Sequence, residues 1–116
     1  MTLAAALFVA VGVQAAESIK SFNAAMEVGS NATLMVRETI TYDFGETERH
    51  GIYRTIPTTY ERNGLTYRVR LTVQAVKRDG ASEPYTVQRN DGGVEIQIGS
   101  PDLTIAGAHT YEIQYL

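Results

Sequence analysis

The stretch TLMVRETITYDF, residues 33–44, decides the fold class of this chain. Its even-numbered positions carry every large apolar side chain but one, together with a single acid. Alternation over twelve residues has the period of a β-strand with one buried face, and the many threonine, valine, isoleucine and tyrosine residues favour a strand. The apolar face consists of Leu34, Val36, Glu38, Ile40, Tyr42 and Phe44.

The same period of two recurs on both sides of this stretch. It is visible in residues 22–28, 58–60, 65–75, 85–87, 94–98 and 111–115. Turn sequences separate these segments, among them Asn63-Gly64 and Asp79-Gly80. No segment after the first fifteen residues has a helical period. The pattern predicts an all-β fold, an antiparallel β-sandwich of immunoglobulin or fibronectin-like architecture. No Cys-Trp-Cys pattern supports a true immunoglobulin domain.

The N-terminal residues form a separate segment. TLAAALFVAVGV, residues 2–13, is uncharged and too short to span a membrane as a helix. It fits the apolar core of a secretory signal, and the small residues that follow place the cut after Ala15. No Lys or Arg precedes the core, which is unusual for a signal, and a short buried helix is the alternative. We predict a signal peptide over 1–15 and a β-domain over 16–116.

Composition narrows the class of protein and its compartment. A chain of 116 residues with a net charge of −3 suits one domain, and no basic stripe indicates nucleic acid. There are no cysteines, although small secreted domains often depend on disulfides. This favours bacterial export, so that the Asn31-Ala32-Thr33 sequon is incidental. The alternating pattern still runs at Leu116, which is typical of a domain trimmed from a longer protein.

No motif in the chain indicates catalysis. The two histidines, His50 and His109, lie far apart in the sequence, and no Gly-x-Ser-x-Gly nucleophile motif occurs. Glu46, Glu48 and His50 would share one side of an extended chain, but a solvated loop explains them better than a metal site. We predict no catalytic residue, no bound metal and no cofactor.

Two arginines and one turn are further candidate binding features. Arg68 and Arg70 could bind an anionic glycan or lipid head group, although the polar outer face of a strand is the simpler reading. The turn NDGG, residues 90–93, holds one aspartate, too few for a calcium site.

The segment 45–57 carries the most functional information. Its second half reads HGIYRTIP, and a connection of this length between strands is often functional. Pro57 favours an extended chain before it, which places Ile52, Arg54 and Ile56 on one side and Tyr53 on the other. We predict that Ile52, Ile56 and Pro57 anchor the segment. The candidate binding residues are His50, Gly51, Tyr53 and Arg54.

Strand parity also suggests a buried ion pair. If Arg54 points inward with the two isoleucines, its charge needs a partner. Glu38 is the one acid on the inward face of residues 33–44. We therefore predict an Arg54–Glu38 pair beneath the segment, with Arg54 facing a ligand as the alternative.

Three stretches carry a family resemblance. VRETITYDF (residues 36–44), HGIYRTIP (50–57) and GAHTYEIQYL (107–116), in this order, resemble the N-terminal part of the bacterial predicted membrane protein family called domain of unknown function 2207. The resemblance implies a signal peptide, an exported β-domain and transmembrane helices further along the chain. The family has no established activity, so the resemblance implies no catalytic or binding residue.

These observations together favour a non-catalytic extracytoplasmic domain of a membrane-anchored bacterial protein. The domain would face the periplasm or cell surface and bind an envelope protein, peptide or glycan through segment 45–57 and its neighbouring edge. A structural spacer that packs on the rest of its own chain is the alternative. An envelope hydrolase or a metal site around Glu46, Glu48 and His50 is the third reading.

Overall fold

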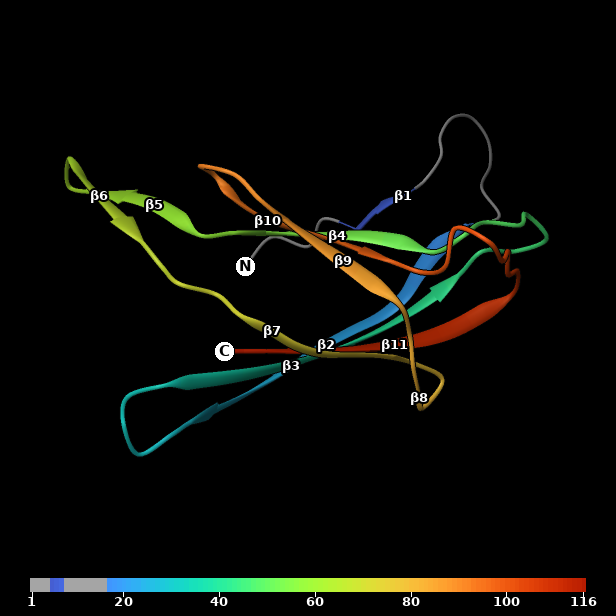
Figure 1. Cartoon of the computed structure of the whole chain (residues 1–116), viewed down its shortest axis with the longest axis horizontal. Helices are drawn as coiled ribbons and strands as arrows, with labels where there is room; N and C mark the ends of the chain where they lie inside the picture. Colours follow the sequence, from blue (N-terminus) through green and yellow to red (C-terminus); the bar gives the residue numbers. More distant parts are fainter. Residues whose placement is uncertain (1–4, 8–16) are drawn as a thin grey trace.

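The computed structural model describes residues 5–7 and 17–116, which form two packed layers of β-sheet (Figure 1). All strand pairs are antiparallel. The predicted all-β fold class is confirmed. Apart from residues 5–7, the segment predicted as a signal peptide lies outside the described residues.

The first sheet has four strands in the order β1-β4-β10-β9. Their bounds are Ala5–Leu7, Ile52–Pro57, Gly93–Ile98 and Tyr85–Arg89. The second sheet has five strands in the order β2-β3-β11-β7-β8. Their bounds are Ser18–Val28, Leu34–Asp43, Ala108–Tyr115, Val73–Arg78 and Ala81–Ser82. A separate hairpin pairs β5 (Thr59–Arg62) with β6 (Leu65–Arg68).

The core lies between the two sheets and uses the inward faces that the alternation predicts. From β3 and the residue that follows it, the core takes the even-numbered side chains 36 to 44, while Leu34 at the start of the strand is exposed. The opposite sheet contributes alternate residues of β4 and β10, and β11 contributes three more. The core side chains of these strands are Ile52, Ile56, Val94, Ile96, Ile98, Tyr111, Ile113 and Tyr115.

The long strand expected over residues 65–75 is two strands in the structure. β6 ends at Arg68 and β7 begins at Val73. In the pairing of β11 with β7, Gln114 lies opposite Ala75, but the next residue, Tyr115, lies opposite Val73. The residue of β7 between Val73 and Ala75 has no partner and forms a β-bulge. The inward face consequently moves to Val76. Continuous alternation in the sequence hides this break because the bulge depends on the partner strand.

The segment 45–57 is also more regular than predicted. Residues 52–57 form β4 and pair with β10 along its whole length, from Ile52 opposite Ile98 to Pro57 opposite Gly93. The expectation of one connecting loop over 45–57 was therefore wrong for its second half. The period of two in this half, which placed Ile52 and Ile56 inward, is that of a sheet strand with a neighbour on each side.

Two glycines allow the entry to β4 and the exit from β10 to touch. Gly51 precedes β4, Gly99 follows β10, and both have positive φ values, of 157° and 129°. A Cβ atom on Gly51 would overlap the carbonyl oxygen of Ile98, and one on Gly99 would overlap that of His50. Both are backbone atoms that cannot rotate away, so only glycine fits at either position.

We expect Gly51→Ala to destabilise the domain by about 2 kcal/mol or more, because the added methyl group forces two backbones apart. Chemical denaturation followed by circular dichroism would measure the loss. Gly92→Ala is the matched control, since its nearest neighbour to an added Cβ, a side-chain oxygen of Asn90, lies at an ordinary 3.7 Å. Equal stability of the two variants would contradict this account of the close approach.

Candidate functional site

Arg54 of β4 and Glu38 of β3 meet between the two sheets. The Arg54 Nε and Nη2 atoms donate to Glu38 Oε1 and Oε2, each at 2.8 Å. Both side chains are fully buried, with 0% exposure. The contact is therefore bidentate, the geometry in which arginine and carboxylate bind most strongly. Of the two orientations considered for Arg54, the structure has the one that faces the core.

The surroundings complete the hydrogen bonding of this pair. Arg54 Nη1 donates to the Thr55 carbonyl at 2.6 Å, and the Tyr115 hydroxyl donates to Glu38 Oε2 at 2.7 Å. The Phe22 ring lies 5.7 Å from the guanidinium carbon. Burial, followed by the bond to Glu38, raises the pKa of Tyr115, so this hydroxyl stays a donor. A buried pair needs such satisfied neighbours to offset its desolvation.

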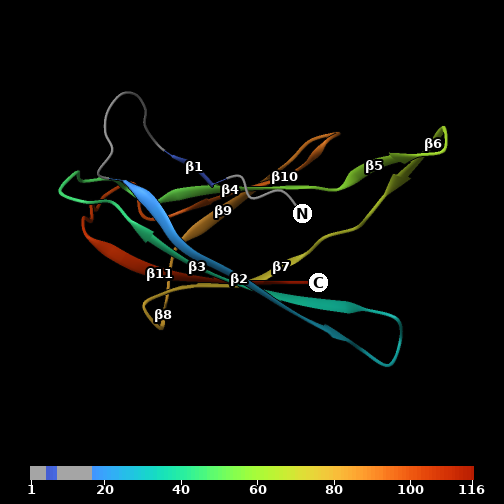
Figure 2. The same ribbon diagram turned by 180° about the vertical axis from the view of Figure 1, so that it is seen from behind.

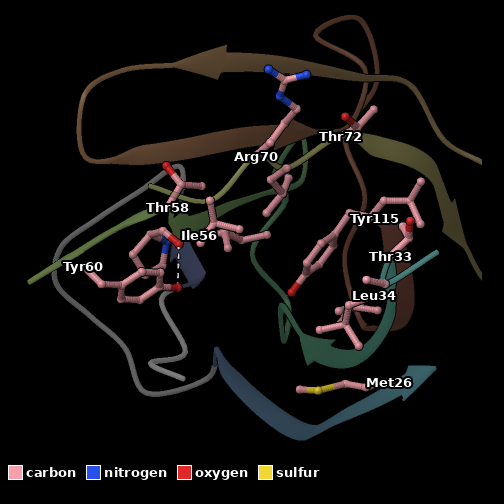
Figure 3. Close-up of a pocket in the computed structure, with 15 residues that line it drawn as sticks. Met26, Thr33, Leu34, Ile56, Thr58, Tyr60, Arg70, Thr72 and Tyr115 are labelled. Carbon is pink, nitrogen blue, oxygen red and sulfur yellow. Dashed lines mark hydrogen bonds between the residues drawn. The ribbon is translucent and has the colours of Figure 1, made fainter. Parts of the chain in front are cut away.

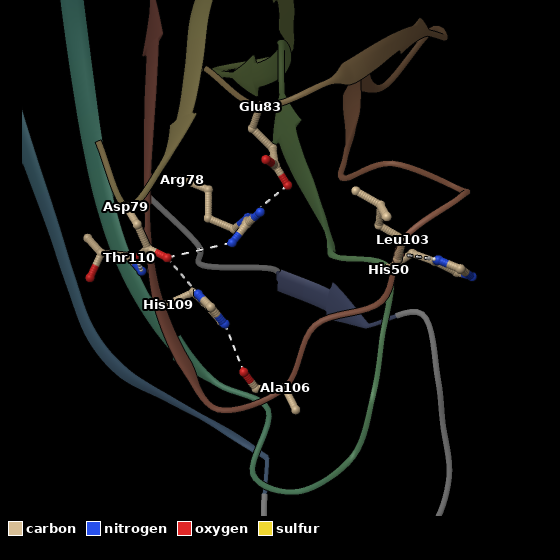
Figure 4. Close-up of polar contacts among 8 residues, drawn as sticks. All are labelled: His50, Arg78, Asp79, Glu83, Leu103, Ala106, His109 and Thr110. Atoms are coloured by element: carbon tan, nitrogen blue, oxygen red, sulfur yellow. Dashed lines mark hydrogen bonds and ion pairs between the residues drawn. The ribbon is translucent and has the colours of Figure 1, made fainter. Parts of the chain in front are cut away.

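Burial of Arg54 corrects part of the predicted binding surface. Arg54 and Gly51 are both buried and do not reach a ligand outside the core. Tyr53 is partly exposed on the outer face of its sheet, opposite Gln97. His50 is exposed, and its Nδ1 lies 2.7 Å from the Leu103 carbonyl (Figure 4).

Glu48 and His50 hold their loop through two separate contacts. Glu48 Oε1 accepts a hydrogen bond from Thr104 Oγ1 at 2.6 Å, while His50 contacts the neighbouring Leu103. Within residues 5–7 and 17–116, no three potential metal ligands come together. The arrangement fits a loop held to the connection between β10 and β11.

A polar cluster that the sequence analysis missed holds one end of the sandwich. His109 Nδ1 lies 2.6 Å from Asp79 Oδ2, and its Nε2 lies 2.8 Å from the Ala106 carbonyl (Figure 4). The imidazole therefore bridges the Asp79 carboxylate and the Ala106 carbonyl. Arg78 adds a contact to Asp79 at 3.6 Å and a bond to Glu83 at 2.9 Å. Only the pairing of β7 with β11 brings these residues together.

The same cluster sets the protonation of Asp79. The His109 hydrogen bond, and then the bond of 2.9 Å from the Thr110 N–H, hold the pKa of Asp79 below the usual range of an aspartate. A carboxyl group whose pKa is lower in the folded state stabilises the fold above its unfolded pKa. That contribution disappears as the pH falls through the folded pKa.

We expect Asp79→Asn to lower the stability at pH 6 and to make little difference at pH values below the folded pKa of Asp79. Urea denaturation across this range would show the two curves converging as the pH falls. Asp102→Asn, which removes the same charge from an exposed turn, serves as control. A stability gap that stays constant with pH would rule out the proposed linkage.

An apolar cleft opens at the other end of the sandwich. The β2–β3 and β5–β6 hairpins project there in both views, with the C-terminus between them (Figures 1 and 2). The cleft holds about 700 Å³ and takes side chains from both sheets (Figure 3). Its apolar lining includes Met26, Leu34, Val36, Ile56, Pro57, Val69, Leu71 and Tyr115.

Several cleft side chains remain exposed. Met26 is 62% exposed, Val69 53% and Leu34 42%. Arg70, a candidate anion contact in the sequence, also lines the cleft. Tyr60 lines it too, and its hydroxyl donates to the Pro57 carbonyl at 2.9 Å. The period of two places Met26, Leu34 and Val69 on the apolar faces of residues 22–28, 33–44 and 65–75. It does not show that the sheets diverge at this end and leave these side chains uncovered.

The fold and its site define a class of protein: an antiparallel β-sandwich with a buried ion pair and an apolar cleft at one open end. A family model described as "Predicted membrane protein (DUF2207) N-terminal domain" matches residues 18–116. The chain belongs to this family, as its resemblance indicated. No curated protein and no solved structure matched the chain. No helix among the described residues is long and apolar enough to cross a bilayer.

We expect Glu38→Leu or Arg54→Met alone to cost about 3–5 kcal/mol, because each leaves an unpaired buried charge. The double variant removes both charges and should cost less than the sum of the single changes. Urea denaturation of all four proteins gives the coupling energy. A coupling near zero would show that the pair does not act as a unit.

Tyr115→Phe provides a milder test if the single charge variants do not fold. It removes only the hydroxyl donor to Glu38 and should cost about 1.5–3 kcal/mol, the range for a hydrogen bond to a charged group.

Proposed function

We propose that this chain is the exported, non-catalytic β-domain of a membrane-anchored protein, and that its cleft docks an extended apolar polypeptide segment. The family supports membrane association. The cleft between the two hairpins carries the docking proposal, because it is large and its exposed side chains are apolar. Soluble domains seldom leave such surface uncovered unless something binds there.

The shape of the cleft favours a polypeptide strand over a small molecule. It is an open trough with a wall from each sheet, and the strands along it have unequal lengths. A strand added to such an incomplete sheet gains backbone hydrogen bonds, while alternate side chains enter the apolar trough. Neither gain is open to a compact polar ligand.

The two residues of the predicted surface that stay accessible, His50 and Tyr53, lie away from the cleft lining. We still predict that these two residues form a second contact for an envelope protein, peptide or glycan. This prediction rests on their exposure. The cleft has the stronger geometric support.

We expect a short fluorescent peptide that alternates Val and Thr to bind the domain, and Leu34→Asp or Val69→Asp to weaken this binding about tenfold or more. The added charge would be desolvated against the apolar strand. Fluorescence anisotropy measures the affinity, and a peptide of the same composition in blocked order tests the need for alternation.

Leu103→Asp is the control, because Leu103 is also an exposed apolar residue, at 64%, and lies outside the cleft lining. All three changes are at exposed positions, so the thermal stability should change little. Unchanged peptide affinity in the Leu34 and Val69 variants would contradict docking in the cleft.

A further inference from the structure

The ladders on the two sides of β3 end at different residues beside the cleft. The pairing of β11 with β3 ends at Tyr115 opposite Val36, whereas the pairing of β2 with β3 continues to Val28 opposite Leu34. On the other side of β11, Leu116 exchanges two backbone hydrogen bonds with Thr72, at 3.0 and 3.2 Å. Beyond these pairs, Leu34 and residues 69–71 line the cleft from its two sides.

The register of the two ladders specifies the hydrogen bonds of a strand that continues β11. Along an antiparallel strand, successive residues direct their backbone groups to alternate sides. Since Leu116 bonds to Thr72, the next residue of such a strand would direct its N–H and C=O toward β3, opposite Leu34. The second residue would direct them to the other side, opposite Arg70. The Leu71 carbonyl is not needed by this strand, and it already accepts from Arg89 Nη1 at 2.7 Å.

The same register decides which side chains would enter the cleft. Along β11, Tyr111, Ile113 and Tyr115 face the core and alternate with side chains that face outward. The first and third residues of a continuation would therefore point inward. The first would lie between Leu34 and Leu71, both of which line the cleft.

We propose that the segment directly following this domain in the full-length protein occupies the cleft as a continuation of β11. The inference rests on the proposed docking function and names its occupant. The family describes this domain as N-terminal in a predicted membrane protein, so more chain follows it. That chain would reach the cleft by prolonging a strand, without a turn. Its first and third residues carry apolar side chains.

Residue-resolved amide hydrogen exchange tests the proposal. The full-length protein in detergent is compared with the chain that ends at Leu116. We expect the amides of Leu34 and Arg70 to exchange at least about tenfold more slowly in the full-length protein, because each gains a ladder hydrogen bond. The amide of Leu71, which the continuation does not bond, is the internal control.

Variants of the following segment separate its effect from general stabilisation. Asp at the first and third positions after Leu116 should restore fast exchange at Leu34 and Arg70, whereas Asp at the second, outward position should not. Equal exchange of Leu34 and Arg70 in the full-length and short chains would overturn the proposal. So would protection in the short chain that rises with protein concentration, since a second copy would then fill the cleft.

The alternating peptide distinguishes this failure from failure of the docking function. If the occupant is the following segment, the short chain binds the peptide and the full-length protein does not. Binding to both proteins with equal affinity would leave the docking function standing and refute this occupant. Binding to neither would refute the docking function itself.

Discussion

The buried pair between Arg54 and Glu38 is the constraint on which the rest of the structure depends. Each charge lies in the apolar space between the sheets and can stay there only opposite the other. A slip of β4 or β3 by one residue would turn one charge outward and leave the other unpaired. Apolar side chains tolerate an approximate fit, so the pair specifies the position of one sheet on the other more strictly than the core does.

The ion pair also influences the cleft, because residues next to the pair line it. Tyr115 donates to Glu38 and lines the cleft, while Ile56 follows Arg54 by two residues and lines it from the opposite sheet. Both walls of the cleft are thus fixed by side chains tied to one ion pair. A cleft with fixed walls can receive a strand with less loss of conformational entropy than one that must first become ordered.

The sequence predicts what depends on local alternation and misses what depends on pairing. Parity alone placed Arg54 and Glu38 inward, because the direction of a side chain in a strand follows from its position. The bulge opposite Tyr115 and the contact of His109 with Asp79 depend on which strands are neighbours. Alternation also continues in Leu65, Tyr67 and Val69, although this part of the chain leaves the core and all three are exposed. A period of two shows that a strand has an apolar face, but only the fold shows whether another part of the chain covers that face.

The two ends of the sandwich therefore differ in how much stability further contacts could add. At one end His109, Asp79 and Arg78 already satisfy each other. At the other end, apolar side chains such as Met26 and Val69 still face solvent, and each would contribute roughly 1–2 kcal/mol if buried. A strand from a separate molecule would lose part of this gain to the entropy of association. A strand joined directly to β11 is held at a high effective concentration and loses far less. The energetic balance at this end consequently favours a strand from the same chain over one from a partner.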